Sequence, residues 1–365
     1  MTGDALRLAT RGSALARRQA ELVRDAVETR RNPVELLDVE TTGDRVTEEL
    51  IHRLGTTGAF VRALDERVLD GEADAAVHSM KDMPTDQPDE LLVAGIPERA
   101  SAGDLLVSPD GYAFEELPEG ATVGTGSLRR RAQLLRTRPD LEVEPLRGNV
   151  DTRLAKLLAP TIQAEREQRR EADAERKGNV GDDDFEPAYD RTVDEWFEER
   201  SALERDALSR EVDTEYDAIV LAEAGLERSG LLDAVEWSRL PKREFVPAPG
   251  QGALAVTATR GATANRIRDA VDHRRTRVET TVERRMLAEL GGGCIAPIGI
   301  HAVVQGPYVH TSVQVLGGDG AEIIAGTRDL DVERHTQEAD EFAADLAARG
   351  AADLIEAARR EAGEE

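Results

Sequence analysis

The sequence has 365 residues and is strongly acidic, with 73 Asp and Glu residues against 47 Lys and Arg residues and a formal net charge of −26. This excess of negative charge argues against binding to bulk nucleic acid. No apolar run approaches the ~20 residues of a membrane span, and the first residues lack the apolar core of a signal peptide. We therefore expect a cytoplasmic protein with no membrane partner, long enough for two or three domains.

Only four of the 47 cations are lysines. An acidic surface in which arginine almost replaces lysine indicates a protein kept soluble in concentrated salt, where the Debye length falls to about 3 Å at 1 M and like charges barely repel. We hypothesise a salt-rich cytoplasm.

One unit recurs along the chain: a short apolar run, a turn rich in Gly, Ser, Thr or Arg, and then a helical pattern. It occupies residues 6–27, 121–135, 141–158 and 216–232. Strands that alternate with helices predict an α/β fold with largely parallel sheets, in which ligands bind at the carboxyl ends of the strands. The polar turns fall at those ends.

Two segments depart from this unit. From about residue 272 the pattern reads as a helix (277–290), a cysteine-containing loop, two strands and a final helix (338–360), which predicts a small α+β domain. Residues 160–213 hold 27 charged positions and no long apolar stripe, so we interpret them as a solvated insertion, partly helical and partly disordered. An acidic interaction arm is the alternative for this insertion.

The chain has one cysteine, Cys294, in the run LAELGGGCIAPIG. A single cysteine excludes an internal disulfide framework and a cysteine-rich zinc site, and we expect no metal. An isolated intracellular cysteine is most often a small buried hydrophobe. Gly291, Gly292 and Gly293, however, remove side chains beside the sulfur and allow a large ligand to approach it closely.

Three turns carry arginine and hydroxyl side chains. Anions are favoured at such strand-to-helix turns by free backbone N–H groups and the helix dipole. Three adjacent arginines (129–131) at the start of a predicted helix are unfavourable there unless an anion lies among them, and arginine binds carboxylates bidentately. A capping serine beside solvated arginines is the alternative for the first turn. The residues concerned are Arg11, Ser13, Thr125, Ser127, Arg129, Arg130, Arg147 and Arg153.

In DAAVHSMKDMPT (74–85), Lys81 and Asp82 leave a predicted strand side by side, after Ser79. An exposed ion pair would be the ordinary explanation, but Lys81 is one of only four lysines, which indicates a need for its compact ammonium. The Pro/Gly turn of VPAPGQGALAV (246–256) suits a hinge where the chain returns between domains.

Seven runs resemble, in order, the porphobilinogen deaminase (hydroxymethylbilane synthase) family: ATRGSALARRQA, GAFVRALDERVLDGEADAAVHSMKDMPT, VGTGSLRRRAQL, LRGNVDTRLAKL, YDAIVLAEAGLERSGL, PAPGQGALAV and GGGCIAPIG. The resemblance implies two doubly wound domains like those of periplasmic binding proteins and a small α+β C-terminal domain. We place domain 1 at 1–98 and 250–270, domain 2 at 99–249, and domain 3 at 271–365.

The resemblance also implies the chemistry. Cys294 would hold a dipyrromethane cofactor through a thioether, and the enzyme would extend it by four porphobilinogen units with loss of ammonia, then release hydroxymethylbilane by hydrolysis. We expect a monomer whose only partner is this small-molecule substrate. Asp82 would be the catalytic carboxylate. Cofactor carboxylates would be bound by Ser79, Lys81, Thr125, Ser127, Arg129, Arg130 and Arg153, and the substrate by Arg11, Ser13, Arg147 and Phe60.

Some residues differ from the family pattern. Thr56-Thr57 and Arg62-Ala63 replace a Gly-Lys and a Lys-Glu pair in a segment that is a lid in relatives, and Gly126 replaces a common serine. Two alternatives stay open. A two-lobed protein that only binds a carboxylate would share the arginines, whereas a thiol hydrolase would pair Cys294 with His78 or His301, although the sequence shows no His-Asp constellation.

Overall fold

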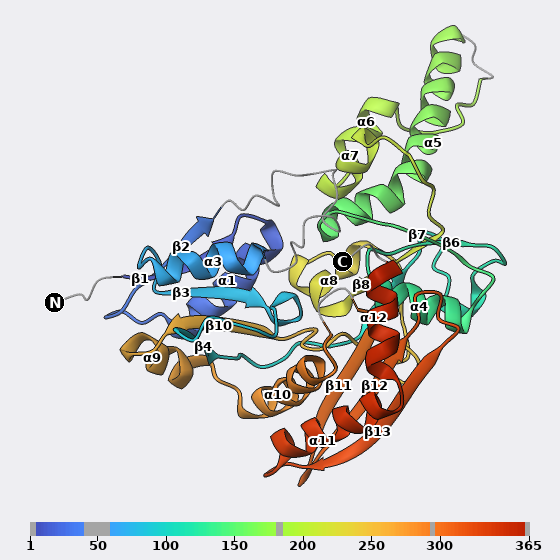
Figure 1. Cartoon of the computed structure of the whole chain (residues 1–365). Helices are drawn as coiled ribbons and strands as arrows, with labels where there is room; N and C mark the ends of the chain where they lie inside the picture. The colour runs from blue at the N-terminus through green and yellow to red at the C-terminus, as the bar shows by residue number, and fades with distance from the viewer. Residues whose placement is uncertain (1–4, 40–58, 180–184, 293–295, 362–365) are drawn as a thin grey trace.

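The structure is a computed structural model, and it describes residues 5–39, 59–179, 185–292 and 296–361 (Figure 1). Its strands form three sheets, two of five strands and one of three. The α/β fold predicted from the repeated unit is confirmed, since each of its four segments forms a strand followed by a helix.

The first sheet has the strand order β2-β1-β3-β10-β4. β1 runs parallel to β2 and β3, whereas β10, which comes from much later in the chain, runs antiparallel to β3 and β4. Helix α3 packs on one face, and α1 and α9 pack on the other. The elements are β1 (Leu6–Arg11), α1 (Ala14–Val27), β2 (Val34–Val39), α3 (Ala59–Leu69), β3 (Ala75–Ser79), β4 (Leu91–Gly95), β10 (Leu254–Thr259) and α9 (Ala262–Val271).

The second sheet has the order β7-β6-β8-β5-β9, again mixed, with β6 parallel to β7 and β8 and with β5 antiparallel to its neighbours. Leu134 of α4 is buried on one face, and Leu154 of α5 and Leu226 of α8 are buried on the other. The elements are β5 (Asp104–Val107), β6 (Thr122–Gly124), α4 (Leu128–Thr137), β7 (Glu142–Glu144), α5 (Val150–Gly178), β8 (Ala218–Ala222), α8 (Glu223–Ser229) and β9 (Trp237–Arg239).

The C-terminal part forms an antiparallel three-stranded sheet packed against three helices, which confirms the predicted α+β unit. The predicted final helix is two helices, because Gly350 adopts a left-handed φ of 95° between them. A third strand was missed by the pattern. The elements are α10 (Arg274–Glu289), β11 (Ile298–Gln305), β12 (Tyr308–Leu316), β13 (Ile323–Asp331), α11 (His335–Ala348) and α12 (Ala351–Glu361).

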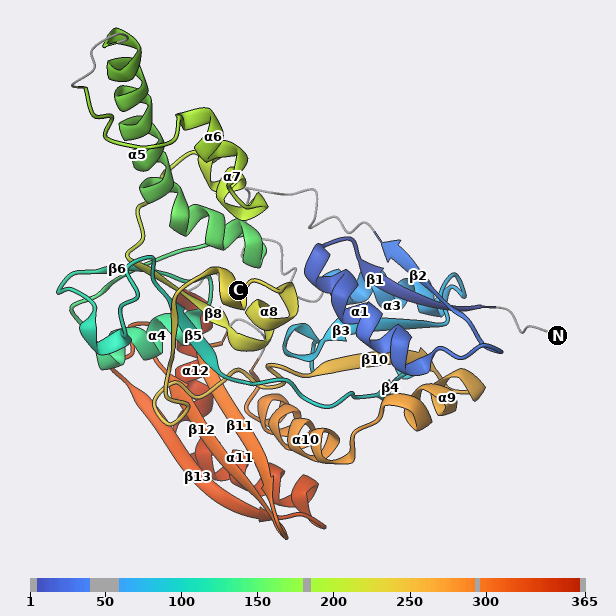
Figure 2. The same ribbon diagram turned by 180° about the vertical axis from the view of Figure 1, so that it is seen from behind.

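The charged insertion is more ordered than the sequence predicts. Helix α5 continues into it for 29 residues in all, and it also contains α6 (Val193–Glu198) and α7 (Ala202–Ser209). The predicted helical character is thus confirmed, but Trp196, Ile162 and Leu208 are buried together, so these helices are not simply solvated. The distal end of α5 projects away from the three sheets (Figures 1 and 2).

Two segments cross between the five-stranded sheets, 96–103 and 240–253, and they lie side by side. The Ala100 N–H donates to the Gly252 carbonyl at 3.2 Å. The Gln251 side-chain amide donates to the carbonyls of Ala102 and Gly103. The predicted hinge turn at 246–256 therefore sits on the second crossing. After this crossing, β10 joins the first sheet between β3 and β4.

Candidate functional site

The Lys81-Asp82 pair lies in a 3-10 turn, Met80–Asp82, directly after β3. The Met80 side chain is buried, and the Met80 backbone N–H donates to the Ala253 carbonyl at 3.0 Å. This hydrogen bond holds the start of the turn against the second crossing segment. Asp82 is exposed and Lys81 is half-buried. A carboxylate is thus presented at a strand end from a rigidly held turn.

The arginines at the start of α4 have a buried counterion within the protein. Asp104, the first residue of β5, has a fully buried side chain that accepts hydrogen bonds from Arg129 Nη2 at 2.8 Å and Arg130 Nη2 at 2.7 Å. Although burial raises the pKa of Asp104, the two guanidiniums outweigh it and hold the pKa well below its usual range. The sequence predicts an anion among these arginines, and Asp104 provides part of that negative charge.

Lys81 and Arg153 lie close enough to this cluster to interact with Arg130. Burial lowers the pKa of Lys81, Arg130 and Arg153 lower it further, and Asp82 opposes them. Burial likewise lowers the pKa of Arg153 to about 10, with Arg130 adding to the effect and Asp82 opposing it. The structure therefore brings Lys81, Asp82, Arg130 and Arg153 together, although they come from the turn after β3, from α4 and from α5.

The two serines of the arginine-bearing turns are helix N-caps. Ser13 Oγ accepts from the Ala16 N–H and Ser127 Oγ from the Arg130 N–H. Each hydroxyl keeps its own proton to donate. Thr125 is buried, and its Oγ1 accepts from the Ser127 N–H at 3.2 Å. A Cβ at Gly126 would lie 2.8 Å from the Leu146 carbonyl, which explains glycine there in place of serine.

The remaining predicted residues are placed less completely. Ser79 ends β3 and Arg11 ends β1, both half-buried at the carboxyl ends of neighbouring strands. Arg147 follows β7 and makes no hydrogen bond or ion pair to any residue that the structure describes. Phe60 belongs to α3, but its side chain is outside the described part.

Cys294 and Gly293 lie outside the described residues, as does the Thr56-Thr57 pair. The two neighbouring glycines have structural reasons of their own. Gly291 follows α10 with a left-handed φ of 67°. A Cβ on Gly292 would lie 2.5 Å from Ile298 Cδ1 and 2.7 Å from Leu287 Cδ1. Packing of the loop therefore requires Gly292, independently of any ligand.

The cation cluster suits a group that carries several carboxylates. Arg153 uses its Nε on the Gly148 carbonyl at 2.8 Å, and neither terminal nitrogen of its fork is paired with a carboxylate within the described chain. Arg129 keeps a buried Nε–H with no acceptor among the described residues. Desolvated cations with unused donors are stabilised by an anionic ligand. The residues present thus fit the acetate and propionate groups of a dipyrromethane.

Sequence reasoning missed the residues that hold the cluster and the crossing segments in place. Asp104 also accepts from the Gln251 amide at 2.8 Å. Glu283 of α10, fully buried, accepts from both terminal nitrogens of Arg99, and also from the Gly250 N–H at 2.7 Å and the Ala302 N–H at 2.9 Å. The one available signal was an acidic residue, Asp104, at the head of the apolar run LLV.

A His-Asp pair that the sequence did not reveal involves His78 of β3, the strand that precedes the Met80–Asp82 turn. His78 Nε2 is 3.0 Å from Asp65 Oδ1 and 3.0 Å from Thr257 Oγ1, and all three residues are buried. The expectation from the sequence that His78 has no Asp partner is therefore wrong. His78 is engaged in linking α3, β3 and β10, which is a structural arrangement.

Two family models match the chain. One, described as porphobilinogen deaminase, dipyromethane cofactor binding domain, matches residues 6–165 and 205–267, and the C-terminal domain model of the same family matches residues 278–349. The chain belongs to the porphobilinogen deaminase family. The unmatched stretch of the first model, 166–204, falls within the charged insertion.

Whole-length relatives agree with this assignment. A probable porphobilinogen deaminase of Halobacterium salinarum is 51% identical over 99% of this chain and 100% of its own length. A probable porphobilinogen deaminase of Methanococcoides burtonii is 37% identical, with 96% of each chain covered. The porphobilinogen deaminase of Sulfurimonas denitrificans is 36% identical, with 95% of each covered. These relatives favour the deaminase reading over the binding-protein and thiol-hydrolase alternatives.

Among the residues that the structure describes, no helix combines the length and apolar character needed to cross a bilayer. The same residues contain no group of three or more His, Cys, Asp or Glu side chains arranged to hold a metal ion.

Proposed function

We propose that this chain joins four porphobilinogen molecules head to tail, releasing one ammonia at each condensation, and frees hydroxymethylbilane by hydrolysis. The observation that carries the proposal is that the exposed carboxylate of Asp82 acts on Lys81 and Arg153, which also lie close to Arg130, in a chain of this family. The dipyrromethane cofactor, when bound, supplies the pyrrole terminus to which the first substrate is joined.

For cofactor binding, we propose that Lys81, Arg130 and Arg153 pair with its acetate and propionate carboxylates. Arg153 offers a guanidinium fork with two unused terminal nitrogens, which suits bidentate binding. Arg129 is instead bound within the protein, because its guanidinium donates to Asp104, Gln133 and the Val246 carbonyl. Its contribution is therefore made mainly by holding Asp104, and with it Arg130, in position. The hydroxyls of Ser79, Thr125 and Ser127 are proposed as additional donors.

Asp82 is the proposed catalytic group. Its carboxyl assists departure of the aminomethyl nitrogen of porphobilinogen as ammonia, first as a proton donor. The resulting carboxylate then stabilises the positive charge left on the substrate. The same carboxylate is proposed to receive the proton that the attacked pyrrole carbon loses.

Substrate carboxylates are proposed to bind Arg11 and Arg147, with Ser13 beside them and Phe60 stacked on a pyrrole ring. Arg147 supports this role because its guanidinium makes no hydrogen bond or ion pair within the described part of the chain. The Gly148 turn that follows it has a left-handed φ of 116° and turns the chain between Arg147 and Arg153. The two arginines are thus held on either side of one bend.

Intact mass under denaturing conditions tests cofactor attachment. We expect the purified protein to exceed its sequence mass by two condensed pyrrole units, and Cys294→Ser to lack that excess, because the proposed thioether forms on this sulfur. An unmodified wild-type mass that persists after incubation with porphobilinogen would support the two-lobed binding protein instead.

Asp82→Asn tests the catalytic assignment. The amide is nearly isosteric but neither donates an acidic proton nor carries a charge, so turnover should fall by about 10²–10⁴-fold. The cofactor mass excess should remain, since the cations that bind its carboxylates are unchanged. Turnover near the wild-type rate in the cofactor-bearing variant would remove Asp82 from the central role.

We also propose that this is a cytoplasmic enzyme of a salt-rich cell. The support is the net charge of −26 and the use of only four lysines, together with the 51% identity to the protein of Halobacterium salinarum. Activity should rise with KCl concentration toward the molar range. A maximum at low ionic strength would contradict this proposal.

A further inference from the structure

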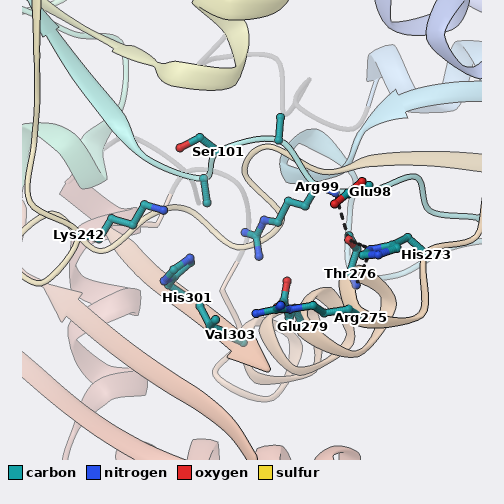
Figure 3. Close-up of a pocket in the computed structure, with 13 residues that line it drawn as sticks. Glu98, Arg99, Ser101, Lys242, His273, Arg275, Thr276, Glu279, His301 and Val303 are labelled. Atoms are coloured by element: carbon teal, nitrogen blue, oxygen red, sulfur yellow. Dashed lines mark hydrogen bonds and ion pairs between the residues drawn. The ribbon is translucent and has the colours of Figure 1, made fainter. Parts of the chain in front are cut away.

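A cavity lies where the two crossing segments meet α10 and β11. Its volume is about 280 Å³, and Figure 3 shows the side chains around it. None of its lining residues belongs to the cluster around Asp82. The cavity is lined by Glu98, Arg99, Ala100, Ser101, Ala102, Lys242, His273, Arg275, Thr276, Glu279, His301, Ala302 and Val303.

Three nitrogen-bearing side chains face the same space in this cavity. The ends of Lys242, Arg99 and His301 point toward one another in Figure 3. Lys242 comes from the second crossing segment, Arg99 from the first, and His301 from β11. A ligand among them would therefore contact all three parts of the molecule.

Positive charge in this cavity is only partly compensated. Arg99 is neutralised by Glu283, and Arg275 by Glu279. Lys242 has no ion pair or hydrogen bond to any described residue. Lys242 interacts electrostatically with Glu223, but the Glu223 carboxylate already accepts hydrogen bonds from Arg239 and Ser101.

The state of His301 agrees with this imbalance. Its ring makes no hydrogen bond within the described part of the chain. The pKa of His301 is lowered to about 3, mainly by burial and then by Arg99 and Lys242, while Glu279 opposes them. The imidazole is therefore neutral near pH 7 and sits in a positive field. Lys242 is one of only four lysines in a chain that otherwise uses arginine, which indicates a need for an ammonium group at this position.

Four of the lining residues have apolar side chains: Ala100, Ala102, Ala302 and Val303. Phosphate or sulfate would leave these side chains without an apolar partner. An anionic head group on a short apolar body would use both the cations and the apolar side chains.

We propose that this cavity binds a small organic carboxylate, with its carboxylate between Lys242, Arg99 and His301. Because the ligand would contact both crossing segments and β11, its binding stabilises the arrangement of the domains described above. The proposal concerns a site distinct from the one around Asp82 and does not depend on the role of that residue.

The probe for the test is glutarate, titrated into the cofactor-bearing enzyme by calorimetry at fixed ionic strength. We expect one site, and an affinity lowered about fivefold or more in Lys242→Gln and in His301→Gln, as loss of a principal charge or hydrogen bond requires. Lys177→Gln is the matched control, because Lys177 is an exposed lysine near the end of α5. Equal affinity in Lys242→Gln and Lys177→Gln, or no binding at millimolar glutarate, would overturn the proposal.

A second readout locates the ligand. The chain has six histidines, so the ring cross-peak of His301 can be assigned by its loss in His301→Gln. It should move saturably with glutarate. Inorganic phosphate that shifts this peak at lower concentration than glutarate would refute the carboxylate assignment. Porphobilinogen, itself a carboxylate, is then added to the glutarate complex. Displacement from the His301 peak identifies the substrate as the ligand, and retention assigns the cavity to another organic acid.

Discussion

Asp104→Asn is the substitution that most directly tests how the arginine cluster is held. The side chain of Asp104 is fully buried, and its carboxylate accepts four hydrogen bonds. Three come from Arg129 and Arg130, at 2.7 to 3.1 Å, and one from Gln251 at 2.8 Å. Asparagine keeps the shape but has one oxygen acceptor, and its NH₂ group would face N–H donors.

The expected loss of stability follows from these contacts. At 4 Å, two unit charges attract by about 4 kcal/mol at an effective dielectric constant near 20, and Asp104 has two such partners. Part of this attraction offsets the desolvation of the three charges in the native protein. Breaking a buried ion pair while its partner stays charged typically costs about 3–5 kcal/mol. We expect the free energy of unfolding to fall by about this amount in Asp104→Asn.

Denaturant unfolding followed by circular dichroism, at one high salt concentration, measures the effect. Asp140→Asn is the control, because Asp140 pairs with Arg138 in the same domain but both side chains are more exposed, at 30% and 22%. Its loss should be below about 1 kcal/mol. If the two variants lose equal stability, Asp104 is not the buried counterion of the cluster. The Asp104 contribution should also disappear as pH falls below 3.8, because its pKa is lowered on folding.

Three further predictions concern the crossing segments. Glu283→Gln should lower the free energy of unfolding by about 3–5 kcal/mol, measured by denaturant unfolding, because Arg99 would lose its buried counterion. Gly252→Ala should destabilise more than Gly120→Ala in the same assay. Both glycines have left-handed φ, but only at Gly252 would a Cβ meet backbone, 2.6 Å from the Ala100 carbonyl oxygen. The free energy of unfolding should fall as pH drops from 6.5 toward 3, because His301 binds a proton in the unfolded chain but stays neutral in the folded protein. The urea midpoint of His301→Gln should therefore depend less steeply on pH across that range than the wild-type midpoint.

Much of the fold was predictable because local pattern decides it. The alternation of Leu6, Leu8 and Thr10, followed by helical spacing from Leu15, gave β1 and α1 correctly, and Ser13 is the N-cap between them. The ends of the helices depended on single residues, whose effect the apolar pattern does not show. Gly350 divides the final helix through its left-handed backbone, although the apolar spacing continues across it.

The insertion shows where composition misleads. Charge density alone indicated a solvated segment, yet Trp196 is buried against α5, and Arg169 and Arg200 lie over its ring at 5.3 and 5.1 Å. One aromatic residue with cation–π partners can anchor short helices in a highly charged context. Such a core is small, and no periodicity over α6 and α7 announces it.

For the site, the sequence identified the cations but not their counterions. Arg129 and Arg130 were recognised because three arginines at a helix start conflict with the helix dipole. Asp104 could not be paired with them, since it lies 25 residues away and reaches them through the order of strands in the sheet. The same holds for Glu283 and Arg99, which are 184 residues apart. Contacts between distant segments depend on topology, which local pattern does not specify.

These buried carboxylates account for how a chain with a net charge of −26 maintains a basic site. Surface acidity is screened over short distances in salt, so it does little to hold cations in position. Asp104 instead sits inside, where one carboxylate orients two guanidiniums and leaves the pair with net positive charge. Lys81 and Arg153 add two more cations, and Asp82 acts on both of them. Four cations thus share two carboxylates, Asp104 and Asp82, and the carboxylates of the proposed cofactor would balance this excess of positive charge.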